Sequence, residues 1–230
     1  MSEHVLSVEL VDRAGPVRGD VIVNRLIIAG WAGRDKQATE KHIAELEAMG
    51  VRRPASTPIF YRVGASRLTT GPSIDVLGDR SSGEAECVIL RARGRLWVGV
   101  GSDHTDRNVE TYDISVSKQV CDKPIASTFW SYDDVEAHWD QLVLRSLVSE
   151  EGMRVVYQEG AVTALLPPAD LMGRLTGVDA FAEGTLMYCG TLPVIGGIRP
   201  ASRFEFELED PVESRKIHHA YTVNRLPVIG

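Results

Sequence analysis

Two glutamates, two residues apart, lead directly into an apolar, β-branched stretch in SSGEAECVIL, residues 81–90. Side chains on a strand alternate between two faces, so Glu84 and Glu86 share a face with Val88. The residues between them are also apolar, which is the pattern of a strand covered on both sides. Buried carboxylates need partners, and two together need a cation or protons. The segment therefore predicts a cation site, and a pair of solvent-exposed glutamates is the alternative.

A second run of alternating glutamates, FEFELED at residues 204–210, has a different pattern. Its large apolar side chains fall on one face and its glutamates on the other, as in a strand with one face in solvent. We therefore expect Glu205, Glu207 and Glu209 at the surface.

Another group of polar residues follows an apolar strand in VGVGSDHTDR, residues 98–107. The group consists of Asp103, His104, Asp106 and Arg107. Polar groups at the exit of a strand often build a site on a rigid element, although a plain Asp/Ser turn has the same composition. Together with the two glutamates, Asp103 would complete a set of three carboxylates. Such oxygen ligands favour a hard divalent cation such as Mg²⁺ over zinc.

A possible proton-transfer pair lies on an expected helix, RDKQATEKHIAELEAMG at residues 34–50. His42 and Glu45 are three residues apart, a spacing that puts both on one helix face. In that arrangement the carboxylate orients the imidazole, which can act as a general base toward water. A surface pair without function is the alternative.

Two further segments offer groups that could hold an anion. SVSKQVCDKP at residues 115–124 carries Lys118 and Lys123, and LMYCGTLPVIGG at residues 186–197 ends a strand at Gly190 and Thr191. A backbone N–H and a hydroxyl at a strand end can hold a substrate carboxylate. Solvated lysines and a simple turn are the alternatives.

The elements that would position these groups are mostly short strands. Apolar or alternating segments separated by Gly, Pro and Asp predict strands at 4–11, 20–31, 58–63, 85–90, 95–101, 185–190, 203–209 and 220–229. Helices are predicted at 34–50, with Asp35 as N-cap and Gly50 as the stop, and at 133–146 and 167–175. No linker divides the chain, so we expect one β-rich α+β domain over residues 1–230.

Composition narrows the possible partners. The chain of 230 residues carries a net charge of −7 and has no Lys/Arg-rich run, which argues against nucleic acid. No apolar run approaches the roughly 20 residues of a membrane helix, and the acidic N-terminus does not resemble a signal peptide. The three cysteines are far apart and form no C-x-x-C pair. We therefore expect a cytoplasmic protein.

In their order along the chain, these motifs resemble the fumarylacetoacetate hydrolase superfamily, which includes acylpyruvases, and in particular a small bacterial branch of it. The resemblance covers about residues 27–197 and leaves residues 1–26 outside. GEAECVIL at 83–90 resembles the E-x-E metal strand, and VGVGSDHTDR resembles the segment with a third Asp ligand and an Arg four residues later. The lid helix with H-x-x-E, the K-to-P segment and the G-T strand correspond to residues 30–46, 117–124 and 183–192.

The resemblance implies an α+β, mostly β fold, a mixed β-roll or sandwich with a few peripheral helices. It also implies a homodimer and an Mg²⁺ or Mn²⁺ ion bound by Glu84, Glu86 and Asp103. The catalytic residues it implies are His42 and Glu45 as a water-activating dyad, together with Lys118. The substrate contacts it implies are Arg107, Gly190, Thr191, Glu110 and Lys123, where Lys123 is a rival to Lys118.

On this resemblance we expect a metal-dependent hydrolase that cleaves a carbon–carbon bond in an acylpyruvate-like or other β-dicarbonyl acid, with an enolate as leaving group. Two alternatives stay open. One is a decarboxylase, hydratase or isomerase with the same metal site, and the other is a non-catalytic protein that binds a dicarboxylate. The chain departs from the family pattern at Leu192, where the family has proline, and at Glu110, where a glutamine is common.

Overall fold

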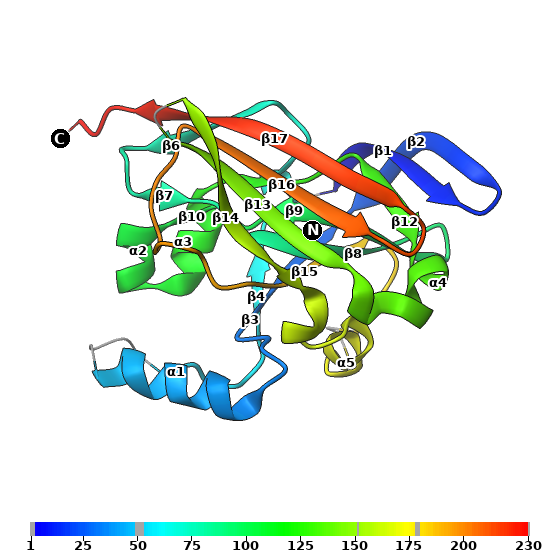
Figure 1. Cartoon of the computed structure of the whole chain (residues 1–230), viewed down its shortest axis with the longest axis horizontal. Helices are drawn as coiled ribbons and strands as arrows, with labels where there is room; N and C mark the ends of the chain where they lie inside the picture. The colour runs from blue at the N-terminus through cyan, green and yellow to red at the C-terminus, as the bar shows by residue number, and fades with distance from the viewer. Residues whose placement is uncertain (1–2, 49–52, 151, 178–179, 230) are drawn as a thin grey trace.

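The computed structural model describes residues 3–48, 53–150, 152–177 and 180–229. Its strands form two main sheets (Figure 1). The larger sheet has the order β2-β1-β12-β9-β8-β15-β3-β4, and the second has the order β14-β13-β16-β17-β6. Two short pairs, β10–β7 and β11–β5, complete the described strands.

The bounds of the strands are as follows. The larger sheet contains β1 (His4–Asp12), β2 (Gly15–Val23), β3 (Arg25–Gly30), β4 (Ile59–Val63), β8 (Ala85–Ala92), β9 (Arg95–Ser102), β12 (Thr128–Ser131) and β15 (Thr185–Thr191). The second sheet contains β6 (Ser73–Leu77), β13 (Val143–Glu150), β14 (Met153–Ala161), β16 (Arg203–Asp210) and β17 (Arg215–Leu226). The short pairs contain β5 (Leu68–Thr69), β7 (Ser81–Ser82), β10 (Thr105–Asp106) and β11 (Lys123–Pro124).

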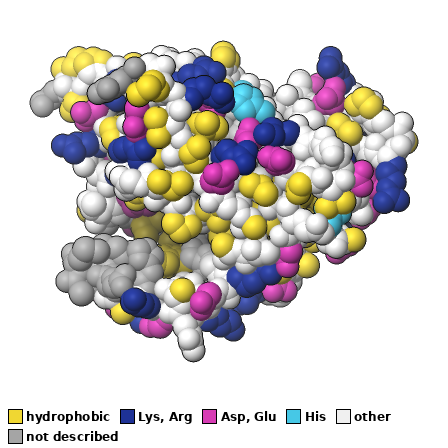
Figure 2. Space-filling model, viewed as in Figure 1, with side chains coloured by type: hydrophobic (Ala, Val, Ile, Leu, Met, Phe, Trp, Pro, Cys, Tyr) yellow, Lys and Arg dark blue, Asp and Glu magenta, His cyan; other side chains and the backbone are white. Residues whose placement is uncertain are grey.

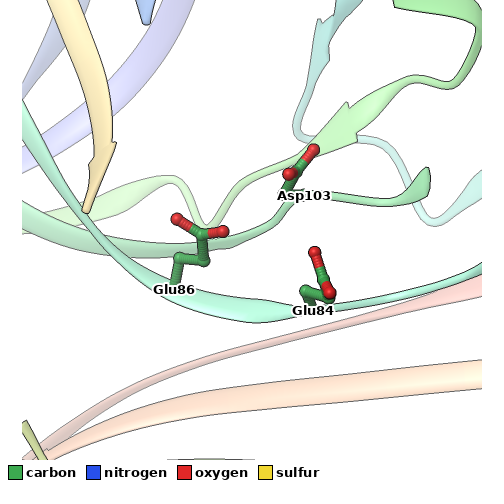
Figure 3. Close-up of side chains that lie close together, drawn as sticks. All are labelled: Glu84, Glu86 and Asp103. Carbon is green, nitrogen blue, oxygen red and sulfur yellow. The ribbon is translucent and has the colours of Figure 1, made fainter. Parts of the chain in front are cut away.

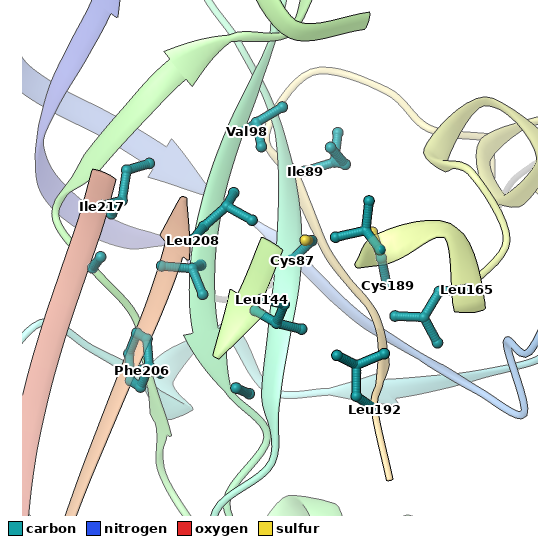
Figure 4. Packing of buried hydrophobic residues seen from close by; sticks show 14 of the residues in the cluster. Cys87, Ile89, Val98, Leu144, Leu165, Cys189, Leu192, Phe206, Leu208 and Ile217 are labelled. Carbon is teal, nitrogen blue, oxygen red and sulfur yellow. The ribbon is translucent and has the colours of Figure 1, made fainter. Parts of the chain in front are cut away.

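The larger sheet is covered on both faces by apolar side chains. Cys87 and Ile89 of β8 point into a core shared with the second sheet, where they meet residues such as Leu208 (Figure 4). Val88 and Leu90 point the other way, into a cluster to which strands from both ends of the same sheet contribute. The larger sheet therefore curls around this second cluster. Strand β8 is buried on both faces, as its sequence predicts.

The second glutamate run lies in β16, and its large apolar side chains enter the core as predicted (Phe204, Phe206 and Leu208). Glu205 and Glu207 lie on the other face, but they are only 8% and 7% exposed. Cationic side chains of other strands of the same sheet pair with them: Arg145, Arg154 and Lys216. Acidic and basic side chains are interspersed on this face of the molecule (Figure 2). The predicted face is confirmed, whereas the predicted solvent exposure is wrong for Glu205 and Glu207 because cross-strand ion pairs cover their carboxylates; Glu209 is partly exposed.

The helices are short and lie outside the sheets (Figure 1). They are α1 (Lys36–Ala48), α2 (Arg107–Tyr112), α3 (Ile114–Val120), α4 (Tyr132–Val135) and α5 (Pro168–Gly173), with 3₁₀ helices at Ala65–Arg67, Glu136–Gln141 and Val162–Ala164. Asp35 caps α1 as predicted, because its Oδ1 accepts hydrogen bonds from the N–H groups of Gln37 and Ala38. The predicted stop, Gly50, lies outside the described residues. Among the described residues, no helix is long and apolar enough to span a membrane.

The helix predicted at 133–146 is wrong in its second half. Helical turns end at Gln141, and strand β13 begins at Val143. Burial in β13 alternates, with Leu144, Ser146 and Val148 inside, which is the period of a strand. Helices α2 and α3 and the hairpin β13–β14 were not predicted.

Candidate metal centre

Three carboxylates meet where β8 and β9 lie side by side. The two strands pair antiparallel, with Glu86 opposite Gly101, and the Asp103 N–H donates to the Glu84 carbonyl at 2.9 Å. One oxygen from each of Glu84, Glu86 and Asp103 can be chosen so that all three lie within 4.8 Å of one another (Figure 3). The structure thus brings together the three acidic residues that the sequence singled out as metal ligands.

The inner carboxylates have little access to water. Asp103 is fully buried, Glu86 is 2% exposed, and Glu84 is partly buried. Burial raises the pKa of Glu86 well above its usual value, and the charge of Asp103 raises it further. Glu86 Oε2 accepts one hydrogen bond, from the Gly190 N–H at 2.7 Å. A cation between these side chains would offset the cost of ionising Glu86.

Two lysines neutralise Asp103. Lys118, from α3, forms an ion pair with Asp103 Oδ2, and Lys123 Nζ lies 3.0 Å from Oδ1. Burial opposes ionisation of Asp103, but the two ammonium groups prevail and lower its pKa to about 2. Burial likewise opposes the charge on Lys118, yet Asp103, Glu84 and Glu86 together raise its pKa. Both lysines that the sequence left as rivals therefore reach the carboxylates, and Lys118 is held as a cation.

Arg107 contacts the carboxylate group through Glu84. Its Nη2 lies 3.1 Å from Glu84 Oε1, its Nη1 donates to Glu110 at 2.9 Å, and its Nε donates to Ser82 Oγ at 2.8 Å. Burial lowers the pKa of Arg107, but Glu84 and Glu110 more than compensate. Asp106 caps α2, the helix that begins with Arg107. This cap positions the guanidinium at the edge of the carboxylates.

Gly190 and Thr191 lie at the end of β15, against strand β8, which carries Glu86. Thr191 Oγ1 donates to the Ala85 carbonyl at 2.9 Å and accepts from Gln158 Nε2 at 2.7 Å. Gly190 donates to Glu86 Oε2. In the structure both groups therefore hold strand β8, and their contact with a substrate stays a prediction.

The positions of His42 and Glu45 fall within helix α1. The side chains of both residues lie outside the part of the chain that the structure describes. The water-activating dyad therefore stays a prediction.

Two buried polar residues of the second sheet support the site without any signal in the sequence. Tyr221 Oη lies 2.8 Å from His104 Nδ1 and 2.9 Å from Ser102 Oγ. His104 Nε2 lies 2.9 Å from Ser81 Oγ. Burial lowers the pKa of His104 to about 3, with contributions from nearby Lys123 and Arg107. The uncharged His104 side chain therefore links Tyr221 to the loop that carries Asp103. The other supporting residue of the second sheet is Gln158.

A model of the family described as "protein of unknown function (DUF2848)" matches residues 29–221. The chain belongs to the DUF2848 family. The matched region of this DUF2848 protein contains the three carboxylates, both lysines and Arg107. By sequence, no curated protein matches the chain.

Solved structures extend the comparison to the fold. The apo form of 2-keto-3-deoxy-D-arabinonate dehydratase has a TM-score of 0.63 and 16% identity, over 89% of this chain and 74% of that chain. A dehydratase of the same name complexed with magnesium and 2,5-dioxopentanoate gives 0.62 and 14%, over 90% and 74%. The protein Cg1458 with inhibitor gives 0.64 and 14%, over 94% and 81%. These likenesses confirm the predicted fumarylacetoacetate hydrolase-like α+β fold for this DUF2848 protein.

Proposed function

We propose that this DUF2848 protein is a divalent-metal-dependent enzyme that acts on a small 2-oxo acid. The observation that carries the proposal is the convergence of Glu84, Glu86 and Asp103, with oxygen atoms within 4.8 Å of one another. Carboxylates held together in the protein interior repel one another unless a cation or bound protons offset their negative charge. Asp103 Oδ1 is also buried without an aligned hydrogen-bond donor, although Lys123 is near it. These residues fit a hard cation with oxygen ligands, such as Mg²⁺.

The charges around the carboxylates favour an anionic substrate. Glu110 adds a fourth carboxylate, and the cationic side chains in contact with this group are Lys118, Lys123 and Arg107. With all of these groups ionised, the cluster has one net negative charge. A bound divalent cation would change that to one net positive charge, which matches a monocarboxylate. The neighbouring dehydratase structure with magnesium and 2,5-dioxopentanoate supports a small oxo acid as ligand.

The chain's own residues would bind the substrate and transfer protons. A divalent cation held by Glu84, Glu86 and Asp103 would supply Lewis-acid polarisation of a carbonyl oxygen. Arg107 and the lysine ammonium groups would bind the carboxylate and fix its orientation. Because its acidic neighbours keep Lys118 protonated, Lys118 is suited to bind an anion. The base would be His42, oriented by Glu45.

Among reactions of 2-oxo acids, we favour loss of water from a hydroxylated 2-oxo acid. Two of the compared structures are of a dehydratase, and a lysine ammonium group beside the site suits hydrogen bonding to a departing hydroxyl group. The second candidate is hydrolysis of a carbon–carbon bond in an acylpyruvate-like acid. It is favoured by the positions of His42 and Glu45, three residues apart within α1, which suit activation of water.

Metal analysis of the purified protein, followed by a substrate screen, tests the proposal. We expect a divalent metal in the protein or its uptake from Mg²⁺ or Mn²⁺ solutions. With metal, we expect turnover of a 3-deoxy-2-oxo sugar acid or, for the second candidate, a β-diketo acid. Removal of the metal by a chelator should abolish turnover, and added Mg²⁺ should restore it. Full activity after chelation contradicts the proposal. Light scattering on the same sample tests the homodimer.

A further inference from the structure

A glutamine of the second sheet reaches across to the metal strand. Gln158, in β14, is fully buried. Its Oε1 accepts hydrogen bonds from Ala85 N at 2.9 Å and Ser146 Oγ at 2.8 Å. Its Nε2 donates to Thr191 Oγ1 and to the Leu192 carbonyl, both at 2.7 Å. Because an N–H can only donate and a carbonyl can only accept, the orientation of the amide is determined and all of its hydrogen-bonding positions are used.

A β-bulge turns Gln158 inward. In the pairing of β13 with β14, Ser146 lies opposite Gln158, but the next pair is Leu147 with Val156, so Tyr157 is an extra residue. Neighbouring residues of a regular strand point to opposite faces. Tyr157 and Gln158 are nevertheless both fully buried, and Gln158 contacts strands of the other sheet. The bulge therefore re-aims the glutamine toward β8.

The glutamine holds the backbone between two metal-ligand candidates. Ala85 lies between Glu84 and Glu86, and its N–H is bound by Gln158 while its carbonyl is bound by Thr191 Oγ1. The ladder between β8 and β15 is irregular here, with a register shift between Tyr188 and Thr191. Gln158 thus supplies hydrogen bonds at a point where regular strand pairing is interrupted.

The irregular pairing of β8 with β15 also contributes a hydrogen bond to the site. Gly190, within the shifted segment, has a φ of +96°, and an added Cβ would lie 2.8 Å from the Ala32 side chain. This conformation suits glycine, and its N–H donates to Glu86 Oε2. The interrupted pairing therefore frees one N–H to hold the Glu86 side chain, while Gln158 holds the backbone next to it.

We propose that Gln158 is a positioning residue for the metal centre: it fixes the peptide groups on both sides of Ala85, so that Glu84 and Glu86 stay directed toward Asp103. This role rests on the proposed function. Only a neutral amide satisfies these neighbours. An apolar side chain would leave the Ala85 N–H and the Leu192 carbonyl unpaired in the interior, and a carboxylate could not donate to that carbonyl.

A titration of the variant Gln158→Met with Mn²⁺, in which electron paramagnetic resonance measures the bound metal, tests this role. Methionine keeps the length of the side chain and removes its hydrogen bonds. We expect Mn²⁺ to bind about 10–100-fold more weakly, as is typical when a residue that supports a metal ligand is lost. The control is Leu208→Ala, which destabilises the same core between the sheets without contact with the carboxylates. It should leave Mn²⁺ affinity unchanged.

A second variant covers the case in which Gln158→Met does not fold. Thr191→Val removes the hydroxyl that links Gln158 to the Ala85 carbonyl and retains the side chain's shape. It should also weaken Mn²⁺ binding. An unchanged dissociation constant in either folded variant overturns the proposal.

Failure of the unmodified protein to bind Mn²⁺ would contradict the proposed function instead. Hydrogen exchange of the metal-free protein then decides the role of Gln158 on its own. Faster exchange of the Ala85 amide in Gln158→Met, relative to Leu208→Ala, supports the positioning role. Equal exchange in the two variants overturns it.

Discussion

The glutamates of β8 and those of β16 share an alternating pattern but differ in what neutralises them. In β16, Glu207 is paired with Arg145 and Lys216, which overcome the effect of burial and lower its pKa. In β8, no cationic side chain of the described residues lies within ion-pair distance of Glu86, and burial raises its pKa well above the usual value. These two carboxylates, both less than a tenth exposed, therefore have opposite pKa shifts, since Glu86 is the more deeply buried and Glu207 is the one with ion-paired cations.

This difference separates a structural carboxylate from a candidate ligand. Side chains of the protein supply the positive charge that neutralises Glu207, so that carboxylate needs no bound cation. Among the described residues, Glu86 accepts a hydrogen bond from the Gly190 N–H, and the charge of Lys118 only partly offsets its burial, so ionisation of Glu86 calls for a further cation. Deep burial without an ion-paired cation, more than the E-x-E spacing, distinguishes a candidate cation site from a covered strand face.

The comparison is tested most severely by removing one charge from each strand. Glu86→Gln should lose bound metal and lower turnover by at least about a hundredfold, because a ligand should matter more than the residues that support one. Glu207→Gln should retain both metal and turnover. Metal content of the purified variants, with kinetics on any substrate found, checks this prediction. Equal metal content in the two variants would break the comparison.

Stability against pH should also separate the two strands, in opposite directions. The folded pKa of Glu86 is raised above its unfolded value, so the free energy of unfolding of the metal-free protein should fall as pH rises between the two values. The folded pKa of Glu207 is lowered, so its contribution is present above the unfolded pKa and is lost as pH falls through the folded value.

Urea unfolding of the metal-free variants from about pH 4 to 8 measures both effects. Glu86→Gln should remove the fall in stability toward higher pH. Glu207→Gln should lower the free energy of unfolding by about 1–3 kcal/mol at neutral pH, because it leaves Arg145 without one of its partners. A Glu86→Gln variant that is less stable than the unmodified protein at neutral pH would contradict the raised pKa of Glu86.

Local sequence patterns predicted much of the site. They could not predict which residues and strands, far apart in the sequence, pair with one another. Alternation correctly placed Glu86 on the face of Val88 and Leu90. The exposure predicted for Glu205 and Glu207 was wrong because their partners Arg145 and Arg154 are more than 50 residues away in the sequence, and nothing local shows that β13 and β14 lie on one side of β16. The inward Gln158 depends on a bulge and on sheet order, neither of which has a periodic signal.

The missed hairpin has a similar cause. The apolar run from Leu142 to Leu144 continues the pattern of the preceding helical turn, and such a run does not distinguish a buried strand from a helix. Contact with β16 decides in favour of a strand. The same hairpin carries Ser146 and Gln158, so the part of the chain that was hardest to predict is the part that supports the metal strand.

The smallest expected effect concerns Glu110, which shares the guanidinium of Arg107 with Glu84. It is partly exposed and accepts a hydrogen bond from Arg107 at 2.9 Å. Glu110→Gln should strengthen binding of an anionic substrate by about two- to fivefold, the effect of a partly solvated charge, because it frees part of the Arg107 guanidinium. The effect should appear as a lower KM with little change in kcat.

Steady-state kinetics at low and high salt check this prediction, since added salt should reduce the gain. The partly exposed Glu209 offers a matched control, because it pairs with Arg145 and Lys216 far from the carboxylates of β8. Glu209→Gln should leave KM unchanged. Weaker substrate binding in Glu110→Gln would mean that Glu110 itself contacts the substrate, as the sequence predicts, and that Arg107 needs its acidic partner to be held in place.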